Sequence, residues 1–177
     1  MDKGFLKIRG NFWVVFNKFQ GFSLKKLSNY TKILKPDNKT VIIMKKSLVI
    51  SIDFDGTCVA HDFPRVGADI GAVPILKRIV KNGHRLLLNT MRSYNEDGIA
   101  DTITPALNWF SNNNIPIWSV NENPEQWRWT NSNKIFANYY IDDTSIGIPL
   151  LMIPDLSRRP FVDWERVEKI LEEKGII

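Results

Sequence analysis

Cysteine is nearly absent from this chain of 177 residues, in which Cys58 is the single example. One cysteine cannot form an intrachain disulfide, so the composition favours a reducing, cytoplasmic location. Long apolar runs are absent as well, and none approaches the roughly 20 residues of a membrane-spanning helix. Apolar residues make up 44% and charged residues 24% of the chain, which are values of an ordinary globular domain and exclude a fibrous or highly charged disordered protein.

Acidic residues are scarce in residues 1–46, which hold 11 Lys or Arg against 2 Asp or Glu. Residues 47–177 hold 13 against 17, so the net charge of +5 belongs to a basic N-terminal extension. Nucleic-acid binding by the body is therefore not supported. We expect the extension to be poorly packed, with a helical stretch. Three interpretations of the extension are open. It is a basic segment that lies on a membrane or polyanion, or a targeting peptide, or a non-native leader before a natural start at Met44.

Strand and helix patterns alternate through the body. Helical spacing predicts a helix between Pro74 and Gly83, a second over 99–110 that Pro105 kinks or divides, and a third capped by Asp163. This alternation predicts an α/β fold with a mainly parallel sheet, helices on both faces and no second domain. Apolar runs predict four strands and a short fifth, at residues 48–54, 85–90, 115–120, 137–141 and 150–153.

Two carboxylates follow the first predicted strand directly. The segment Ile52–Thr57 (I-D-F-D-G-T) places Asp53 and Asp55 one residue apart at its carboxyl end. Alternate strand residues point the same way, so both side chains can face the crevice where open α/β sheets bind ligands. Like charges held together need a cation, a shared proton or hydrogen bonds, and Mg²⁺ prefers such hard oxygen ligands. The alternative is a solvated turn.

Polar residues end other strands too. Thr90 ends the second strand, Asp142 and Asp143 end the fourth, and Lys134 precedes the fourth. In a parallel sheet the residues at the strand ends meet at one edge. Each also has an ordinary explanation: a helix cap for Thr90, a turn for the acidic pair, and a solvated surface position for the lysine.

In this order the motifs resemble the haloacid dehalogenase-like superfamily of phosphohydrolases, over about residues 46–177. The resemblance implies a Rossmann-like core and Mg²⁺-dependent hydrolysis of a phosphate monoester through an aspartyl-phosphate. It implies that Asp53 is the nucleophile, Asp55 the general acid/base, Thr90 a hydrogen-bond donor to phosphate and Lys134 the steadying cation. The implied metal ligands are the side chain of Asp53, the backbone carbonyl of Asp55 and one aspartate of the pair at 142–143. The analogy favours Asp143 as the direct ligand, with Asp142 supporting it from the second layer around the metal.

Residues after the first motif are candidates for substrate contacts. Gly56 allows close approach of the backbone, and Thr57 fixes the turn or binds the carboxylates. The resemblance implies that residues 58–71 form a flap over the site, in which His61, Asp62 and Arg65 are candidates to contact substrate. The alternative for His61 is a hydrogen bond that stabilises the flap itself. The substrate-binding set is therefore Gly56, Thr57, His61, Arg65 and Arg92, the two arginines being phosphate clamps or surface charges.

The spacing leaves no room for a cap domain. Intervals of 35 residues from Asp55 to Thr90 and 44 from Thr90 to Lys134 are filled by predicted elements. The stretch at 63–67, F-P-R-x-G, is similar to small capless members of the superfamily. An open site suits a large substrate, or a lid from loops or another subunit of a homo-oligomer. Trp127 and Trp129 either stack a base or sugar there or pack on the core or an interface.

Several functions remain open. The second Asp and the Asp pair argue against a metal-free dehalogenase, and receiver domains carry their acidic pair first, whereas this chain has it last. The first hypothesis is a phosphatase for a phosphorylated substrate of unknown identity. The second is a nucleotide or polynucleotide-end phosphatase, because an Asp-Asp strand ending also occurs in deoxyribonucleotidases of the superfamily. The third is a metal- or phosphate-binding interaction module with little turnover.

Overall fold

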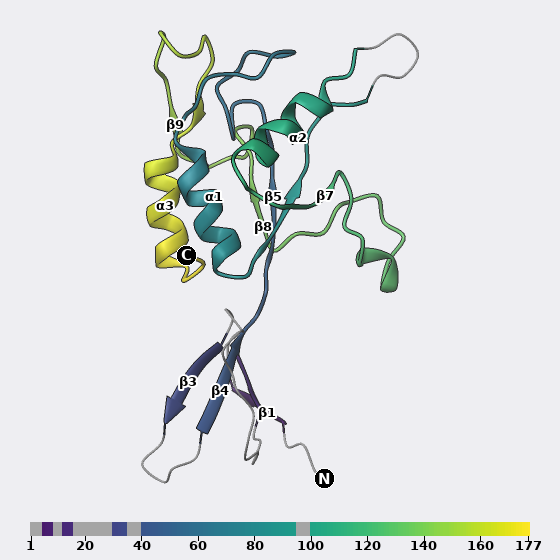
Figure 1. Cartoon of the computed structure of the whole chain (residues 1–177), viewed down its shortest axis with the longest axis vertical. Helices are drawn as coiled ribbons and strands as arrows, with labels where there is room; N and C mark the ends of the chain where they lie inside the picture. The colour runs from purple at the N-terminus through teal and green to yellow at the C-terminus, as the bar shows by residue number, and fades with distance from the viewer. Residues whose placement is uncertain (1–4, 9–11, 16–29, 35–39, 95–99) are drawn as a thin grey trace. The chain divides into compact units, whose positions relative to one another are not determined.

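The computed structural model describes residues 5–8, 12–15, 30–34, 40–94 and 100–177 (Figure 1). The chain divides into two compact units, Met1–Ser47 and Leu48–Ile177. Among the described residues, none of the helices combines the length and apolar character that crossing a membrane requires.

The first unit contains an antiparallel sheet of four strands in the order β1-β2-β4-β3. The β-branched and aromatic runs of this segment favour strands, and the helical stretch expected here is wrong for the described residues. Met44, the proposed natural start, lies within β4 and pairs with Trp13 and Tyr30. The rest of the extension lies outside the described residues. The strands are β1 (Phe5–Ile8), β2 (Phe12–Val15), β3 (Tyr30–Leu34) and β4 (Thr40–Lys45).

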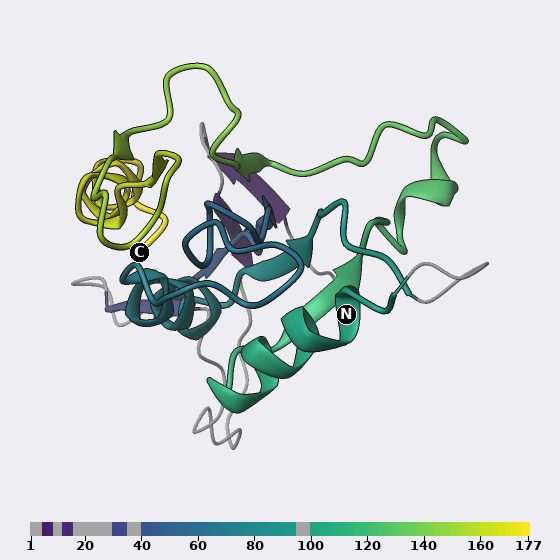
Figure 2. The same cartoon turned by 90° about the horizontal axis from the view of Figure 1, so that it is seen from above.

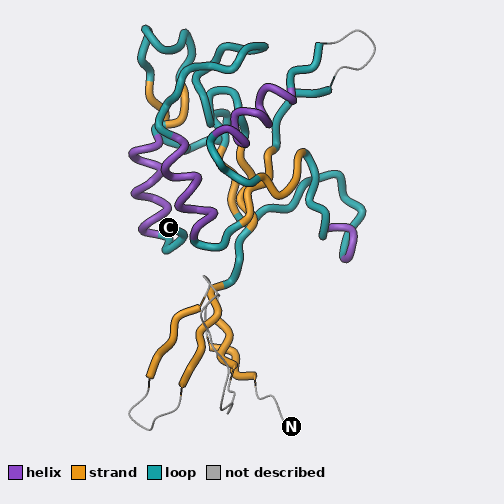
Figure 3. The backbone as a smooth tube through the Cα atoms, in the orientation of Figure 1, coloured by secondary structure: helices purple, strands orange, loops and turns teal. Residues whose placement is uncertain are grey.

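The second unit is built on a parallel sheet in the order β7-β6-β5-β8. Figure 3 shows its strands in orange and the helices in purple. Ile52 in β5 pairs with Leu88 in β6 and with Ile141 in β8, so three strands end at the same level. The α/β class and the mainly parallel sheet are therefore confirmed. The strands are β5 (Val49–Ile52), β6 (Arg85–Leu88), β7 (Ile117–Val120) and β8 (Tyr139–Ile141).

Three α-helices accompany this sheet: α1 (Ala72–Lys81), α2 (Ile103–Asn112) and α3 (Trp164–Glu173). The connections through α1 and α2 step the same way across the sheet, and right-handed crossovers place both helices on one face. Arg78 on α1 pairs with Glu168 and Glu172 on α3, which holds α3 beside α1. Figure 2 shows the β7–β8 connection on the other side. That face carries only the single 3-10 turn η1 (Gln126–Arg128) among the described residues, so the described α-helices lie on one face and not on both as expected.

Two smaller differences concern the later elements. Pro105 falls in the first turn of α2, where an N–H has no helical partner, so it begins the helix without kinking it. The predicted fifth strand is β9 (Leu150–Leu151), which forms an antiparallel pair with β10 (Phe161–Val162) outside the parallel sheet. Asp163 caps α3 as expected, accepting a hydrogen bond from the backbone N–H of Arg166 at 3.1 Å.

A buried core fixes the ends of the parallel strands. Ile50 and Ile52 of β5 are fully buried, as are Leu86 and Leu88 of β6, and Phe54 after β5 packs against the rings of α2. Because close-packed interiors yield little, the polar residues that follow these strands are held by a rigid base.

Candidate functional site

Three aspartates meet at the carboxyl edge of the parallel sheet. Asp53 follows β5, while Asp142 and Asp143 follow the neighbouring strand β8. The backbone N–H of Asp53 donates to the carbonyl of Ile141 at 3.0 Å, which continues the strand pairing into the site. One carboxylate oxygen from each aspartate lies within 4.8 Å of the others. These side chains are therefore placed to share one cation.

The protonation of this cluster is unusual. Burial, and then the charges of Asp142, Asp143 and Asp55, raise the pKa of Asp53 from 3.8 to about 7. Burial also raises the pKa of Asp143, against the opposing effect of His61. Such a group of carboxylates requires bound protons or a cation to hold its negative charge. The donors are all carboxylate oxygens, which fits Mg²⁺ better than a softer metal.

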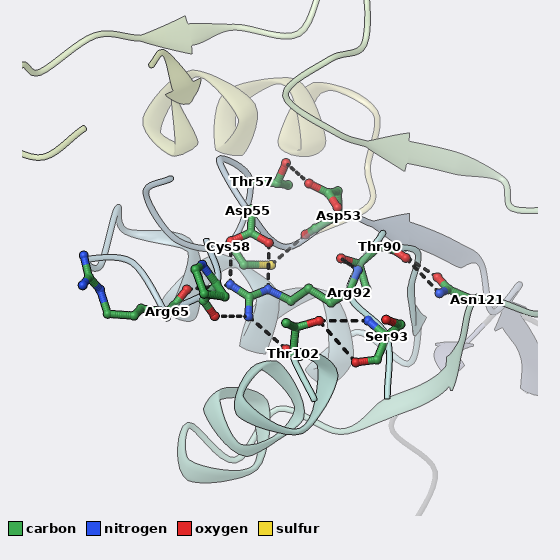
Figure 4. Close-up of polar contacts among 11 residues, drawn as sticks. Asp53, Asp55, Thr57, Cys58, Arg65, Thr90, Arg92, Ser93, Thr102 and Asn121 are labelled. Atoms are coloured by element: carbon green, nitrogen blue, oxygen red, sulfur yellow. Dashed lines mark hydrogen bonds and ion pairs between the residues drawn. The ribbon is translucent and has the colours of Figure 1, made fainter. Parts of the chain in front are cut away.

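The backbone carbonyl and the side chain of Asp55 have different contacts. Its backbone carbonyl accepts no hydrogen bond from any residue that the structure describes, so that oxygen is free for a cation. Its side chain is held by Arg92, whose Nε and Nη2 each donate to one carboxylate oxygen at 2.7 Å (Figure 4).

Arg92 is a buried structural anchor. Besides Asp55, its guanidinium donates to the carbonyls of Pro64 at 2.9 Å, Thr102 at 2.9 Å and Arg65 at 2.6 Å. A guanidinium has five N–H donors, and all are used here in a side chain that is 2% exposed. Arg92 therefore has no donor left with which to clamp a phosphate in this arrangement, although it lies at the edge of the candidate site. The residue instead ties the first motif to the flap and to the start of α2.

Gly56 and Thr57 are buried next to the acidic cluster and contact the aspartates and the histidine there. Thr57 is fully buried; its Oγ1 donates to Asp53 at 3.4 Å and accepts from the backbone N–H of Asp143 at 3.0 Å. Gly56 has φ +78°, and a Cβ there would lie 2.1 Å from Nε2 of His61. Both are buried, so their part is to position the aspartates and the histidine, and the bond from Thr57 to Asp53 is the carboxylate contact that was one expectation for Thr57.

His61 faces the acidic cluster. Its Nε2 lies 3.2 Å from Oδ2 of Asp143, although the two groups are not aligned for a hydrogen bond. Because Nε2 finds no hydrogen-bond partner among the described residues, the ring has polar capacity left for a ligand. Nε2 of His61 therefore does not form the flap-stabilising hydrogen bond that was the alternative for this residue, among the described residues.

A cavity of about 620 Å³ opens above the aspartates, and Thr90 lines it. The amide of Asn121 clamps Thr90 by two hydrogen bonds of 2.8 Å to its backbone. Oγ1 of Thr90 accepts from the backbone N–H of Arg92 at 3.2 Å, which leaves the hydroxyl proton to be donated. The position suits the predicted contact with a phosphoryl oxygen.

Lys134 does not line this cavity. It is exposed and precedes β8, whereas Asp142 follows β8, so the strand separates the two residues. The structure therefore does not bring Lys134 to the aspartates, and its predicted role is left without support from this arrangement. Arg159 lines the cavity instead, and its charge lowers the pKa of Asp143. Sequence analysis missed Arg159 because it lies in the irregular connection from β9 to β10; the adjacent pair Arg158-Arg159 in an acidic body was the available signal.

Other predicted contacts lie elsewhere. Arg65 is exposed and forms two hydrogen bonds with Asp62, at 2.9 and 2.8 Å, beside the cavity and outside its lining. Trp127 and Trp129 are exposed on the β7–β8 connection and do not line the cavity either. A tryptophan lid over the aspartates is thus not present.

The fold and the site together define an α/β protein with an acidic centre at the carboxyl edge of its parallel sheet. No known protein family matches the chain, and no curated protein does. Among solved structures it is similar to a conserved protein from Bacteroides thetaiotaomicron, with 28% identity and a TM-score of 0.56. The match covers 73% of this chain and 93% of that one.

Proposed function

We propose that residues 48–177 form a Mg²⁺-dependent phosphohydrolase of the haloacid dehalogenase-like superfamily, acting on a phosphate monoester. The observation that carries this proposal is the approach of Asp53, Asp142 and Asp143 to within 4.8 Å of one another. The same cavity offers a hydroxyl on Thr90 and a positive charge on Arg159. It therefore combines groups for a cation with groups for a phosphoryl anion.

Asp53 acts as the nucleophile in this proposal. Its carboxylate oxygen bonds to phosphorus as the ester bond breaks, giving an aspartyl-phosphate and a free alcohol; water then attacks phosphorus and releases the carboxylate and inorganic phosphate. Bound Mg²⁺ would supply positive charge that offsets the repulsion between the carboxylate and the phosphoryl oxygens. Thr90 donates a hydrogen bond to a phosphoryl oxygen, and Arg159 provides the charge that the sequence pattern had assigned to Lys134.

Asp55 serves as the acid and base. It protonates the departing alkoxide oxygen and later takes a proton from the attacking water. Both oxygens of Asp55 accept from Arg92 in this structure. The role therefore requires one oxygen to turn from the guanidinium toward the substrate.

Hydrolysis of p-nitrophenyl phosphate tests the proposal. We expect turnover with Mg²⁺, loss of turnover with EDTA, and background rates for Asp53→Asn, because an amide is a far poorer nucleophile than a carboxylate. Asp69→Asn is the matched control, since Asp69 is an exposed aspartate outside the cavity. Near wild-type turnover by Asp53→Asn would exclude Asp53 as the nucleophile.

The same assay separates the alternatives. Mg²⁺ binding by wild-type protein without hydrolysis of any phosphomonoester would favour an interaction module. Nucleoside monophosphates and 5′- or 3′-phosphorylated oligonucleotides should be among the substrates assayed, because they test the nucleotide-phosphatase alternative. The tryptophans expected to stack a base, Trp127 and Trp129, lie outside the cavity. A cytoplasmic location and a homo-oligomer remain predictions, which fractionation and light scattering would check.

A further inference from the structure

A second hollow, of about 520 Å³, shares His61 and Arg159 with the first. The flap contributes Asp62 and Arg65 to its lining, and the connection between β9 and β10 contributes residues 154–159. The two hollows are thus neighbours, with Arg159 at their common boundary. The proposed catalytic residues Asp53, Asp55 and Thr90 line only the first of them.

The two hollows differ in their balance of charge. Four aspartates and two arginines line the first, whereas two aspartates and three arginines line the second. Arg65 is already engaged by Asp62. Arg158 and Arg159 form no ion pair with a carboxylate within the part of the chain that the structure describes. Arg158 is therefore available to an anion, whereas Arg159 is shared with the first hollow, where its charge also acts on Asp143.

The backbone around these arginines is ordered by its own hydrogen bonds. The backbone N–H of the buried Ser157 donates to the carbonyl of Ile153 at 3.0 Å. Its hydroxyl accepts from the backbone N–H of Arg159 at 3.1 Å. The strand pair β9–β10 closes the loop at its base. This turn presents Arg158 and Arg159 from a defined backbone, which lowers the entropy lost when they bind a ligand.

We propose that this second hollow, termed the arginine recess, binds a second phosphate of the substrate. Its substrate class is then a small molecule with two phosphates, one reaching Asp53 and the other held by Arg158, with Arg159 shared between the two phosphates at the common boundary. Planar guanidinium groups bind phosphate through paired hydrogen bonds. The assignment of the first phosphate to Asp53 rests on the proposed function. Binding of the second phosphate does not require turnover.

Equilibrium binding to the full-length Asp53→Asn variant, with Mg²⁺, tests the recess apart from catalysis. Isothermal titration calorimetry would compare bisphosphates of straight-chain diols, from two to eight carbons, with the matching monophosphates. We expect at least one bisphosphate to bind about tenfold tighter than its monophosphate, the gain of one or two hydrogen bonds between charged groups. Arg158→Gln should remove this advantage. Arg166→Gln, an exposed arginine on α3 outside both hollows, should keep it.

The outcomes distinguish the recess from the proposed reaction. Equal affinity for bisphosphates and monophosphates at every chain length would overturn the recess, even if p-nitrophenyl phosphate is hydrolysed. An advantage that survives Arg158→Gln would overturn it as well. An advantage that depends on Arg158, in a protein whose wild type hydrolyses nothing, would leave the recess standing and remove the phosphatase.

Discussion

Arg92 shows how one side chain can hold the shape of a site through its contacts with other parts of the protein. It is buried, and it joins Asp55 to three backbone carbonyls on other segments. Its Cζ also lies 4.9 Å from the centre of the Phe54 ring and 5.3 Å from that of Phe63. The orientation of Asp55 therefore depends on a residue from the loop that follows β6.

Replacing Arg92 by alanine should lower the free energy of unfolding by about 3–5 kcal/mol, because a partly buried carboxylate loses its partner. Urea denaturation followed by circular dichroism measures this. Arg65→Ala is the matched control: its ion pair is exposed and screened by solvent, so its loss should change stability much less. Equal effects of the two substitutions would show that the buried pair has no special part in stability.

The raised pKa of Asp53 makes the metal-free protein sensitive to pH. Folded Asp53 holds its proton more tightly than the unfolded chain does, so this contribution to stability is present at low pH. It is lost as the pH rises from 3.8 toward about 7. Without metal, we expect the melting temperature to fall over this range in wild type and to fall less in Asp53→Asn.

Mg²⁺ affinity should weaken below about pH 7, because the cation must displace a proton. Calorimetry at several pH values checks both, and a Mg²⁺ affinity independent of pH would contradict this competition between cation and proton.

At the scale of elements, the site is built from the ends of two adjacent strands. β5 and β8 are neighbours in the sheet although far apart in the sequence, and Thr57 joins their ends by bonding to Asp53 and Asp143. The indole N–H of Trp164, at the start of α3, donates to the carbonyl of Thr57 at 2.7 Å. The turn after β5 is therefore tied to a strand end and to the last helix.

Thr57→Val should separate these two strand ends. Valine has nearly the same shape and lacks the hydroxyl, so the N–H of Asp143 would lose its acceptor, at a cost of about 1–3 kcal/mol. We expect weaker Mg²⁺ binding as well, because the aspartates would no longer be held together. Thr57→Ser keeps the hydroxyl and should stay close to wild type in metal affinity. Calorimetry and denaturation measure both effects, and a Val variant with unchanged Mg²⁺ affinity would contradict this role.

At the scale of the whole chain, the basic extension and the acidic body are separate compact units. Lys46 and Ser47 at their boundary are exposed, whereas Leu48 is buried in the body. The described residues of the candidate site all belong to the second unit. Catalysis and any anchoring role of the extension should therefore be separable.

A protein beginning at Ser47 should keep cooperative unfolding, Mg²⁺ binding and the hydrolysis rate of the full chain, since it retains the whole core of the body. Thermal circular dichroism and the p-nitrophenyl phosphate assay measure this. Binding to anionic vesicles and to heparin should fall if the extension is an anchor. Unchanged binding would favour a leader, and loss of the cooperative transition would show that the two units depend on each other.

The sequence by itself determined the α/β class, the four parallel strands and the placing of aspartates at their ends. Such features depend on local spacing and on which residues follow an apolar run. Only the tertiary structure decided that Arg92 binds Asp55, that Arg159 lines the cavity while Lys134 does not, and that the α-helices share one face of the sheet. These outcomes depend on contacts between distant segments and on the direction in which irregular connections run. Local periodicity carries no information about either.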